Sequence, residues 1–290
     1  MSYSDAAMKT HTLVLVFFIL STFHSFAGTA KHAPSPPLQQ QWQLVWSDEF
    51  DGPDGSAPDP AKWSFVVEGN GFGNQELEYY TARPENTHVE KGHLVITARK
   101  ERFTGPDGVT REYTSGRINS QKQFEQQYGR FEARIRIPKG QGIWPAFWML
   151  GSDIGKAGWP TCGEIDIMEN VGHELGKVHG SLHGPGYSGT NPLTAAYSLP
   201  KGKRFADDFH LYAVEWEPGV IRFYVDDALY ETQTPGSIPH KQWVFDHPFY
   251  LLLNVAVGGG WPGNPNASTE FPASMVVDYV RVYRKTPLAK

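Results

Sequence analysis

Short runs in which apolar and polar residues alternate recur along most of the chain, and this pattern restricts the fold more than any other feature. Side chains of a β-strand point alternately to its two faces, so each run predicts a strand with one buried face. The runs are 93–99, 129–137, 211–216, 221–225, 250–257 and 276–283. Turns rich in Gly, Pro and Asp separate them, which is typical of a β-sandwich or barrel.

The run 129–137 illustrates the pattern. Its apolar residues are predicted to pack into the core, while Glu132, Arg134 and Arg136 are predicted to face water. Helical periodicity is absent from every long segment, and one helical turn is expected within 200–209. The chain is therefore expected to be an all-β protein.

The N-terminus has the features of a secretory signal. Lys9 precedes the apolar run 13–20, and the small residues Ser25 and Ala27 follow it. Eight apolar residues are too few to span a bilayer of about 30 Å comfortably. Residues 1–27 are therefore predicted to be a signal peptide, with an uncleaved anchor as the alternative. The mature protein is expected to be secreted or periplasmic, away from the membrane.

A Pro-rich, polar linker is predicted at 28–41, and one domain at 42–285, because composition is uniform beyond Trp42. The net charge of −5 argues against nucleic acid as the main partner, since binding phosphates needs a basic face. The single cysteine, Cys162, excludes an internal disulfide. The domain is expected to act as a monomer.

The segment G-E-I-D-I-M-E-N contains three acids that a strand would place unevenly. Glu164 and Asp166 share one face, whereas Glu169 follows Glu164 by an odd step. One extra residue, as in a β-bulge at Ile167 and Met168, would bring all three carboxyls onto the same face.

Three adjacent carboxyls cannot all ionise freely, so the pKa of at least one must rise. Two carboxyls with separated pKa values are what glycoside hydrolysis requires, and about 5–5.5 Å between them suits a retaining mechanism. A calcium site and a solvated strand face remain alternative interpretations of the acids alone.

Three tryptophans favour a carbohydrate site, because indole faces stack on sugar rings. Trp144 and Trp148 are four residues apart and share a face of the predicted strand, although both would also suit a core. Trp261 lies in a Gly-rich turn, where burial is harder.

His183 shares a face with His179 on the next predicted strand, which would place His183 beside Glu169 at the leaving-group side. A zinc site at the two histidines is disfavoured, because the segment lacks the glutamate of the H-E-x-x-H motif.

These motifs together resemble glycoside hydrolase family 16, and in particular its laminarinase-like members, which cleave β-1,3-glucans. The bulged E-I-D-I-M-E carries the resemblance, which spans about residues 42–284. Further matching motifs are W-S-D-E-F-D-G, G-F-G-N-Q-E-L-E-Y-Y-T, S-G-R-I, G-I-W-P-A-F-W-M-L, L-N-V-A-V-G-G and D-Y-V-R-V-Y.

The resemblance implies a β-jelly-roll sandwich of two curved antiparallel sheets with a concave substrate cleft. It implies that Glu164 is the nucleophile and Glu169 the acid/base of a retaining hydrolysis, with Asp166 tuning both. It also implies a sugar-binding set formed by Asn74, Arg117, Trp144, Trp148 and Trp261. The alternation of residues 179–183 adds His183 to this set. No cofactor is expected for catalysis, and a structural Ca²⁺ ion is implied at Glu49, Gly92 and Asp278.

Two other functions remain open. A β-glucan-binding protein without catalysis is disfavoured, because such relatives typically lose the catalytic glutamates, which are present here. The same mechanism could act on mixed-linkage β-1,3-1,4-glucan or on a marine galactan. A neutral glucan fits best, because the chain is acidic and has no cationic cluster.

Overall fold

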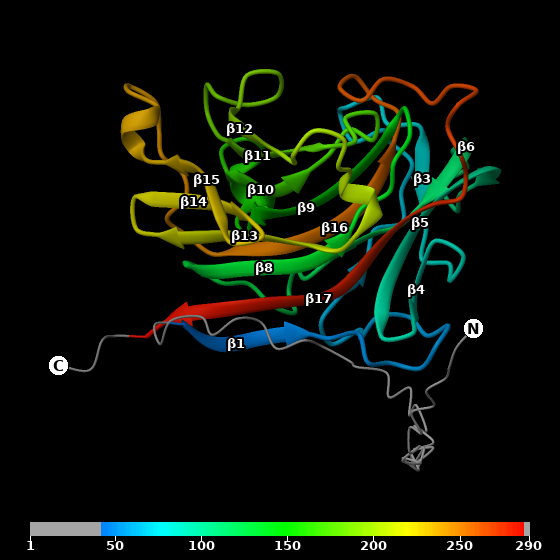
Figure 1. The fold of residues 1–290 in the computed structure, drawn as a ribbon, viewed down its shortest axis with the longest axis horizontal. Coiled ribbons are helices and arrows are strands. Elements are labelled where there is room, and N and C mark those ends of the chain that lie inside the picture. Colours follow the sequence, from blue (N-terminus) through cyan, green and yellow to red (C-terminus); the bar gives the residue numbers. More distant parts are fainter. Residues whose placement is uncertain (1–41, 287–290) are drawn as a thin grey trace, which may run out of the picture. The chain divides into compact units, whose positions relative to one another are not determined.

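The computed structural model describes residues 42–286, and most of its regular structure is β-strand. The strands form two sheets, most of whose strands are labelled in Figure 1, and all pairs are antiparallel except β3 with β6. The predicted all-β, two-sheet fold is confirmed.

The front sheet has the order β12 (Leu193–Ser198), β11 (Lys177–His183), β10 (Glu164–Glu169), β9 (Ile143–Gly151), β16 (Phe249–Val257), β7 (Arg117–Asn119) and β2 (Ser64–Phe65). The back sheet has the order β15 (Ala228–Gln233), β14 (Val220–Val225), β13 (His210–Glu217), β8 (Gly129–Arg136), β17 (Ala273–Lys285), β5 (His93–Thr104), β6 (Thr110–Ser115) and β3 (Glu78–Tyr80). Two more strands, β1 (Trp42–Asp48) and β4 (Thr87–Glu90), pair with β17 and β5. Short helices are α1 (Ile154–Ala157), η1 (Phe205–Asp207) and η2 (Pro235–Ser237).

The core lies between the sheets and explains which face of the front sheet is left for function. On β9, Phe147 and Met149 are fully buried in one large cluster that also contains Phe131 and Val280 of the back sheet. Strand alternation therefore turns Trp148 to the opposite face of β9, where it is half-buried.

All six alternating runs are strands, and the turn expected within 200–209 is the 3₁₀ helix η1. One detail is wrong, because Glu132 does not face water and is 1% exposed. Arg130 donates to its carboxylate at 2.8 Å, and the Tyr283 hydroxyl donates at 3.2 Å. Partners on the same and neighbouring strands thus allow a charged side chain to be buried.

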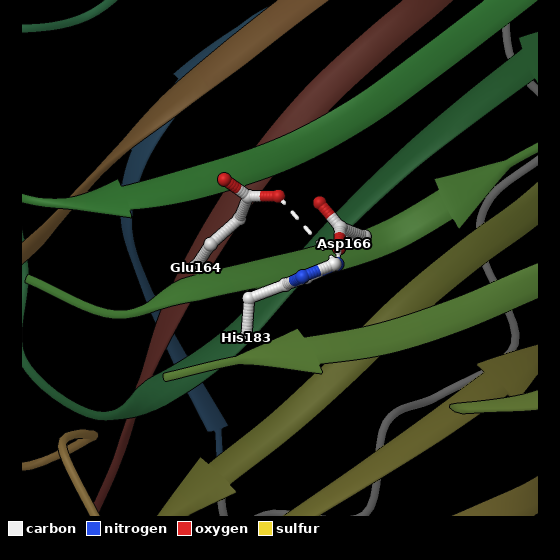
Figure 2. A group of neighbouring side chains, drawn as sticks. All are labelled: Glu164, Asp166 and His183. Atoms are coloured by element: carbon white, nitrogen blue, oxygen red, sulfur yellow. Dashed lines mark ion pairs between the residues drawn. The ribbon is translucent and has the colours of Figure 1, made fainter. Parts of the chain in front are cut away.

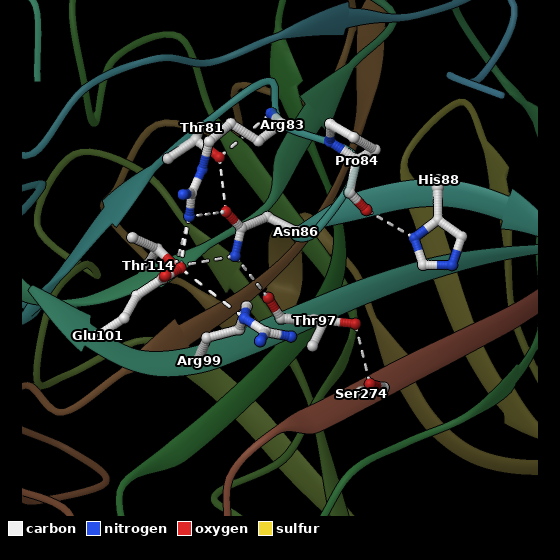
Figure 3. A network of polar contacts seen from close by, with 10 residues as sticks. All are labelled: Thr81, Arg83, Pro84, Asn86, His88, Thr97, Arg99, Glu101, Thr114 and Ser274. Carbon is white, nitrogen blue, oxygen red and sulfur yellow. Dashed lines mark hydrogen bonds and ion pairs between the residues drawn. The ribbon is translucent and has the colours of Figure 1, made fainter. Parts of the chain in front are cut away.

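A polar network ties the segment after β3 to strands β5 and β6 (Figure 3). The Asn86 amide donates to Thr97 O at 3.0 Å and to Thr114 Oγ1 at 3.0 Å, while Arg83 pairs with Glu101. Because β7 follows β6 after a single residue, the network also restrains Arg117 at the start of β7.

The predicted signal peptide at 1–27 and linker at 28–41 lie outside the described residues. Within 42–286, no helix has both the length and the apolar composition that crossing a membrane requires.

A buried acid lies where β15 approaches the front sheet. A Cβ atom at Gly180 of β11 would meet Tyr230 Oη at 2.4 Å and Glu231 Oε2 at 3.1 Å, so only glycine fits there. Glu231 accepts a hydrogen bond from Gln233 at 2.7 Å, but its Oε2 has no partner among the described residues. Burial raises the pKa of Glu231 to about 7.

Glu231→Gln is expected to stabilise the protein above pH 7. A carboxyl whose pKa is raised on folding costs stability as pH rises from its unfolded value through its folded value, here from about 4.5 to about 7. Thermal unfolding at pH 8.5 should show a gain of up to about 3 kcal/mol that is nearly absent at pH 4.5. The exposed Glu85→Gln is the control, and equal gains at both pH values would contradict the assignment.

Candidate active site

The front sheet carries the three acids in a row on β10. Glu164 pairs with Leu150 of β9, Asp166 with Trp148 and Glu169 with Ala146. Along β10 the last interval is three residues, but along β9 it is two, so the strand contains one extra residue. The register on β11 shifts at the same place. The predicted bulge is confirmed, and it puts all three carboxyls on one face.

The bulge is held by burial of the residues that form it. Ile167 and Met168 are both part of the core cluster, although neighbours on a regular strand would point to opposite faces. Two adjacent apolar side chains therefore pack inward, and Glu169 is left to point outward beside Asp166. Burying both side chains contributes roughly 3–6 kcal/mol, which offsets the local loss of sheet pairing.

The carboxyls lie in a poorly solvated place. Asp166 is 2% exposed and Glu169 is 9% exposed. Burial, with the negative charge of Asp166 as the second cause, raises the pKa of Glu164 to about 8. The same two causes raise the pKa of Glu169 well above its usual range. The three groups must therefore share protons near neutral pH.

His183 faces Glu164 and Asp166, as Figure 2 shows. Its Nε2 is 3.1 Å from Asp166 Oδ2 and 3.7 Å from Glu164 Oε1. The Gly189 N–H donates to the other ring nitrogen, Nδ1, at 3.2 Å. Nδ1 is therefore an acceptor, and in the neutral ring the hydrogen lies on Nε2, toward the carboxylates.

This tautomer disfavours a metal ion. Glu164, Asp166 and His183 form a group whose candidate ligand atoms lie within 4.8 Å of one another. A metal on Nε2 would require Nδ1 to carry the hydrogen and to donate it to an acceptor. Nδ1 instead meets the Gly189 N–H, itself a donor. The surroundings of the ring suit a proton shared with the carboxylates.

Trp159 completes the surroundings of Glu164. Its indole N–H donates to Glu164 Oε2 at 2.9 Å, and its ring centroid is 6.1 Å from that of His183. The side chain is nevertheless 48% exposed. Trp159 thus combines an open ring face with a hydrogen bond to an acid.

A different set of rings surrounds Glu169. The Trp144 indole N–H donates to Glu169 Oε1 at 2.9 Å. Trp261 meets Trp144 edge-on at 5.5 Å between ring centroids, and it remains 44% exposed. His179 contacts the other side of Trp261 at 5.1 Å and pairs with Glu174 at 2.8 Å.

On the β16 and β7 side, Asn254 connects the remaining polar groups. The Trp148 indole N–H donates to Asn254 Oδ1 at 2.8 Å. The Arg117 guanidinium lies over Trp148 at 4.8 Å and over Phe72 at 4.6 Å. Asn74 donates to Glu76 at 3.0 Å in the loop before β3.

Most candidate residues lie on or beside the front sheet, but one placement was wrong. His183 lies across from Glu164, not beside Glu169, and His179 is the residue opposite Glu169. The bulge between Asp166 and Glu169 sets this register of β10 against β11. Trp159, Asn254 and Glu76 were not predicted, because their contacts come from segments distant in sequence or from an irregular loop.

The three residues expected to bind calcium are distributed around β17. Glu49 follows β1, Gly92 lies in the turn between β4 and β5, and Asp278 is on β17, which pairs with both β1 and β5. Arg281 holds the Glu49 carboxylate with two bonds of 2.9 Å, and Arg134 bonds Asp278 at 2.7 Å. Calcium would fit only by using backbone carbonyls of Glu49 and Gly92 and sharing the Asp278 carboxylate. This site stays a prediction.

Comparison with known proteins gives consistent matches. The family model described as Glycosyl hydrolases family 16 matches residues 74–281. A beta-glucanase of Rhodothermus marinus is 48% identical over 255 residues, covering 84% of this chain and 85% of that protein. An endo-beta-1,3-glucanase structure from Pyrococcus furiosus is similar, with a TM-score of 0.80, 51% identity and coverage of 84% and 95%. The structure of the laminarinase catalytic domain from Thermotoga maritima is also similar, with a TM-score of 0.80 and 50% identity. The match covers 86% of this chain and 100% of that domain.

Trp159→Phe is expected to raise the pKa of Glu164 beyond its wild-type value of about 8. The variant lacks the indole N–H, which in the wild type donates to the Glu164 carboxylate and stabilises its ionised form. Carboxyl ¹³C NMR titration should show a rise of about one pH unit. Trp42→Phe, on the back sheet, is the matched control. An unchanged titration of Glu164 in Trp159→Phe would show that the indole bond has no electrostatic role.

Proposed function

The chain belongs to glycosyl hydrolase family 16, and from this premise we propose that the protein hydrolyses internal linkages of β-1,3-glucan by a retaining double displacement. It is a glycoside hydrolase. The observation that carries the proposal is the row of three carboxyls, two of them almost wholly buried, of which the outer two have different partners. Such a difference is what separates a nucleophile from an acid/base.

Glu164 is the nucleophile in this proposal. The nearby His183, the Trp159 N–H bond and the charge of Arg117 all act to lower its pKa, against burial and Asp166. Glu169 holds the proton in this proposal, because burial first, and then the charges of Asp166 and Glu164, raise its pKa well above its usual range. Asp166 lies between them, and its charge raises the pKa of Glu164, so the two carboxyls titrate as a pair.

The first step forms a covalent intermediate. The Glu164 carboxylate attacks the anomeric carbon while Glu169 gives its proton to the leaving oxygen, and the glycosidic C–O bond breaks. In the second step, Glu169 takes a proton from water, whose oxygen attacks the same carbon. The ester bond to Glu164 breaks, and both carboxyls return to their initial states with configuration retained.

The substrate assignment is supported by the exposed rings and by the relatives. Trp159 and Trp261 offer open indole faces on either side of the acids, as stacking on a neutral sugar requires. The similar Pyrococcus furiosus and Thermotoga maritima proteins are described as an endo-beta-1,3-glucanase and a laminarinase. The net charge of −5 favours a neutral glucan over a sulfated galactan.

Export belongs to the proposal as well. The pattern at 1–27 supports a signal peptide and release outside the cytoplasm as a monomer. The fate of these residues is tested by the N-terminal sequence of the secreted product, which should begin near Gly28.

Glu164→Gln is expected to abolish release of reducing ends from laminarin while oligosaccharide binding persists, since the amide keeps the shape but loses the nucleophile. The loss in kcat should be at least about a thousandfold. Laminarin, lichenan, agarose and carrageenan should be assayed in parallel, with Glu85→Gln as the control variant.

Each result separates one alternative. Near-normal turnover by Glu164→Gln would contradict the assignment of the nucleophile. Cleavage of lichenan at a similar rate would extend the specificity to mixed linkages, and cleavage of a galactan alone would discard the glucan assignment. Binding of laminarin by a wild-type protein that cleaves none of the four polysaccharides would favour the glucan-binding function.

We also propose a structural calcium ion that joins Glu49, Gly92 and Asp278. Chelation with EDTA should lower the Tm, and added Ca²⁺ should restore it, by roughly 5–10 °C at a hundredfold excess over Kd. Asp278→Asn should remove this response to calcium, while Glu85→Gln should retain it. A Tm that neither EDTA nor calcium changes would refute the site.

A further inference from the structure

A second pair of buried acids lies outside the catalytic row. Glu76 precedes β3 and Glu78 begins it, and their side chains are 4% and 0% exposed. The described residues include no cationic group in an ion pair with either carboxyl. Two buried acids without such a partner are costly unless hydrogen bonds and protons compensate them.

The hydrogen-bond partners of the two acids are unequal. Glu76 receives two donors, Asn74 Nδ2 at 3.0 Å and the Tyr80 hydroxyl at 3.1 Å. Glu78 Oε2 receives the Val257 N–H at 2.6 Å, while Glu78 Oε1 has no donor among the described residues. Glu78 also interacts with Glu76, another acceptor, so a hydrogen bond between them requires a proton.

A chain of oriented hydrogen bonds ends on Glu76. The Trp148 N–H donates to Asn254 Oδ1 at 2.8 Å, and Asn254 Nδ2 donates to the Tyr80 oxygen at 3.2 Å. The Tyr80 hydroxyl has one hydrogen, and it donates that hydrogen to Glu76. Every bond in the chain points toward Glu76, and donors to both of its oxygens stabilise a carboxylate there, so a proton shared by the pair is better placed on Glu78.

We propose that Glu76 and Glu78 form a carboxylate–carboxyl pair, with one proton on Glu78, that positions Trp148 and Asn74 for sugar binding. Both acids are positioning residues, since they act through Asn254, Tyr80 and Asn74. The inference rests on the proposed function for its sugar-binding consequence, but the location of the proton does not depend on it.

The surroundings of Glu78 set the direction of its pH dependence. The charge of Glu76 acts on Glu78, and Glu78 also acts on Tyr80. Tyr113 of β6 pairs with Glu78 across the strands, and the Arg117 guanidinium of β7 is 5.9 Å from the Tyr80 ring. Burial first, and then the charge of Glu76, raise the pKa of Glu78 well above its usual range. Loss of this proton at alkaline pH would put two adjacent buried charges beneath Asn74.

The first test locates the proton without any sugar. The infrared C=O stretch of a protonated carboxyl should be present in wild-type protein at pH 7 and weaker in Glu78→Gln. The wild type minus Glu78→Gln difference spectrum should therefore show it as a positive band. Glu112→Gln, an exposed acid on β6, is the matched control. The proposal is overturned if the wild type and Glu78→Gln have the same protonated-carboxyl band at pH 7.

The second test measures positioning. Binding of laminarihexaose is followed by calorimetry from pH 5 to pH 9 in the Glu164→Gln background, where turnover is absent. Glu78→Gln, whose amide can donate to Glu76 as the carboxyl does, should keep Kd within twofold at pH 5.5 and lose the alkaline rise of Kd. Glu78→Leu cannot donate and should weaken binding about three- to tenfold at every pH.

The outcomes are distinguishable from failure of the proposed function. If wild-type protein neither cleaves nor binds glucan, the proposed function fails, while the infrared result still decides the proton. If glucan binds but Glu78→Gln weakens binding as much as Glu78→Leu, or keeps the alkaline rise of the parent, the positioning role is refuted. Melting curves of both variants confirm that the compared proteins are folded.

Discussion

Three carboxyls held side by side on a nearly dry sheet face are the constraint on which the rest of this structure depends. Asp166 and Glu169 are almost wholly buried, so their charges repel strongly and protons must be retained among them. A regular strand would relieve this repulsion by turning Glu169 inward. The bulge prevents it, because Ile167 and Met168 both pack in the core.

The neighbours of the row then give its two ends different chemistry. Glu164 receives the Trp159 N–H, and His183 Nε2 lies 3.7 Å from Glu164 Oε1 and 3.1 Å from Asp166 Oδ2. Glu169 receives the Trp144 N–H, and its side chain is only 9% exposed. One strand thus supplies three similar residues, and the loops and strands around it give the outer two different hydrogen-bond partners.

The sequence predicted the strands and the acidic row well, because both follow from a period of two residues. The odd step from Glu164 to Glu169 required an extra residue, which the register contains. Trp261 was also predicted well, since a glycine-rich turn leaves a large ring partly exposed. Burial of Glu132 was missed, because its partner Tyr283 lies 151 positions away.

The placement of His183 failed for a related reason. A pattern of alternate residues says which face His183 shares, but not which acid lies opposite, and the bulge moves that register by one residue. Trp159 was overlooked, since its position before β10 follows no period. Its bond to Glu164 depends on how the loop from α1 folds back onto the strand.

The sequence by itself therefore determined the all-β strands, the face on which the acids and tryptophans gather and the need for a bulge, because strand geometry relates these features to residue spacing; the arrangement in two sheets was implied by the family resemblance. Only the tertiary structure decided which acid has which partners, which nitrogen of His183 carries the hydrogen and where Glu76 and Glu78 lie. Hydrogen bonds and burial join segments that are distant in sequence, 179 positions apart for Glu78 and Val257 and 232 for Glu49 and Arg281. The spacing of residues along a single strand cannot predict contacts between segments so far apart in the sequence.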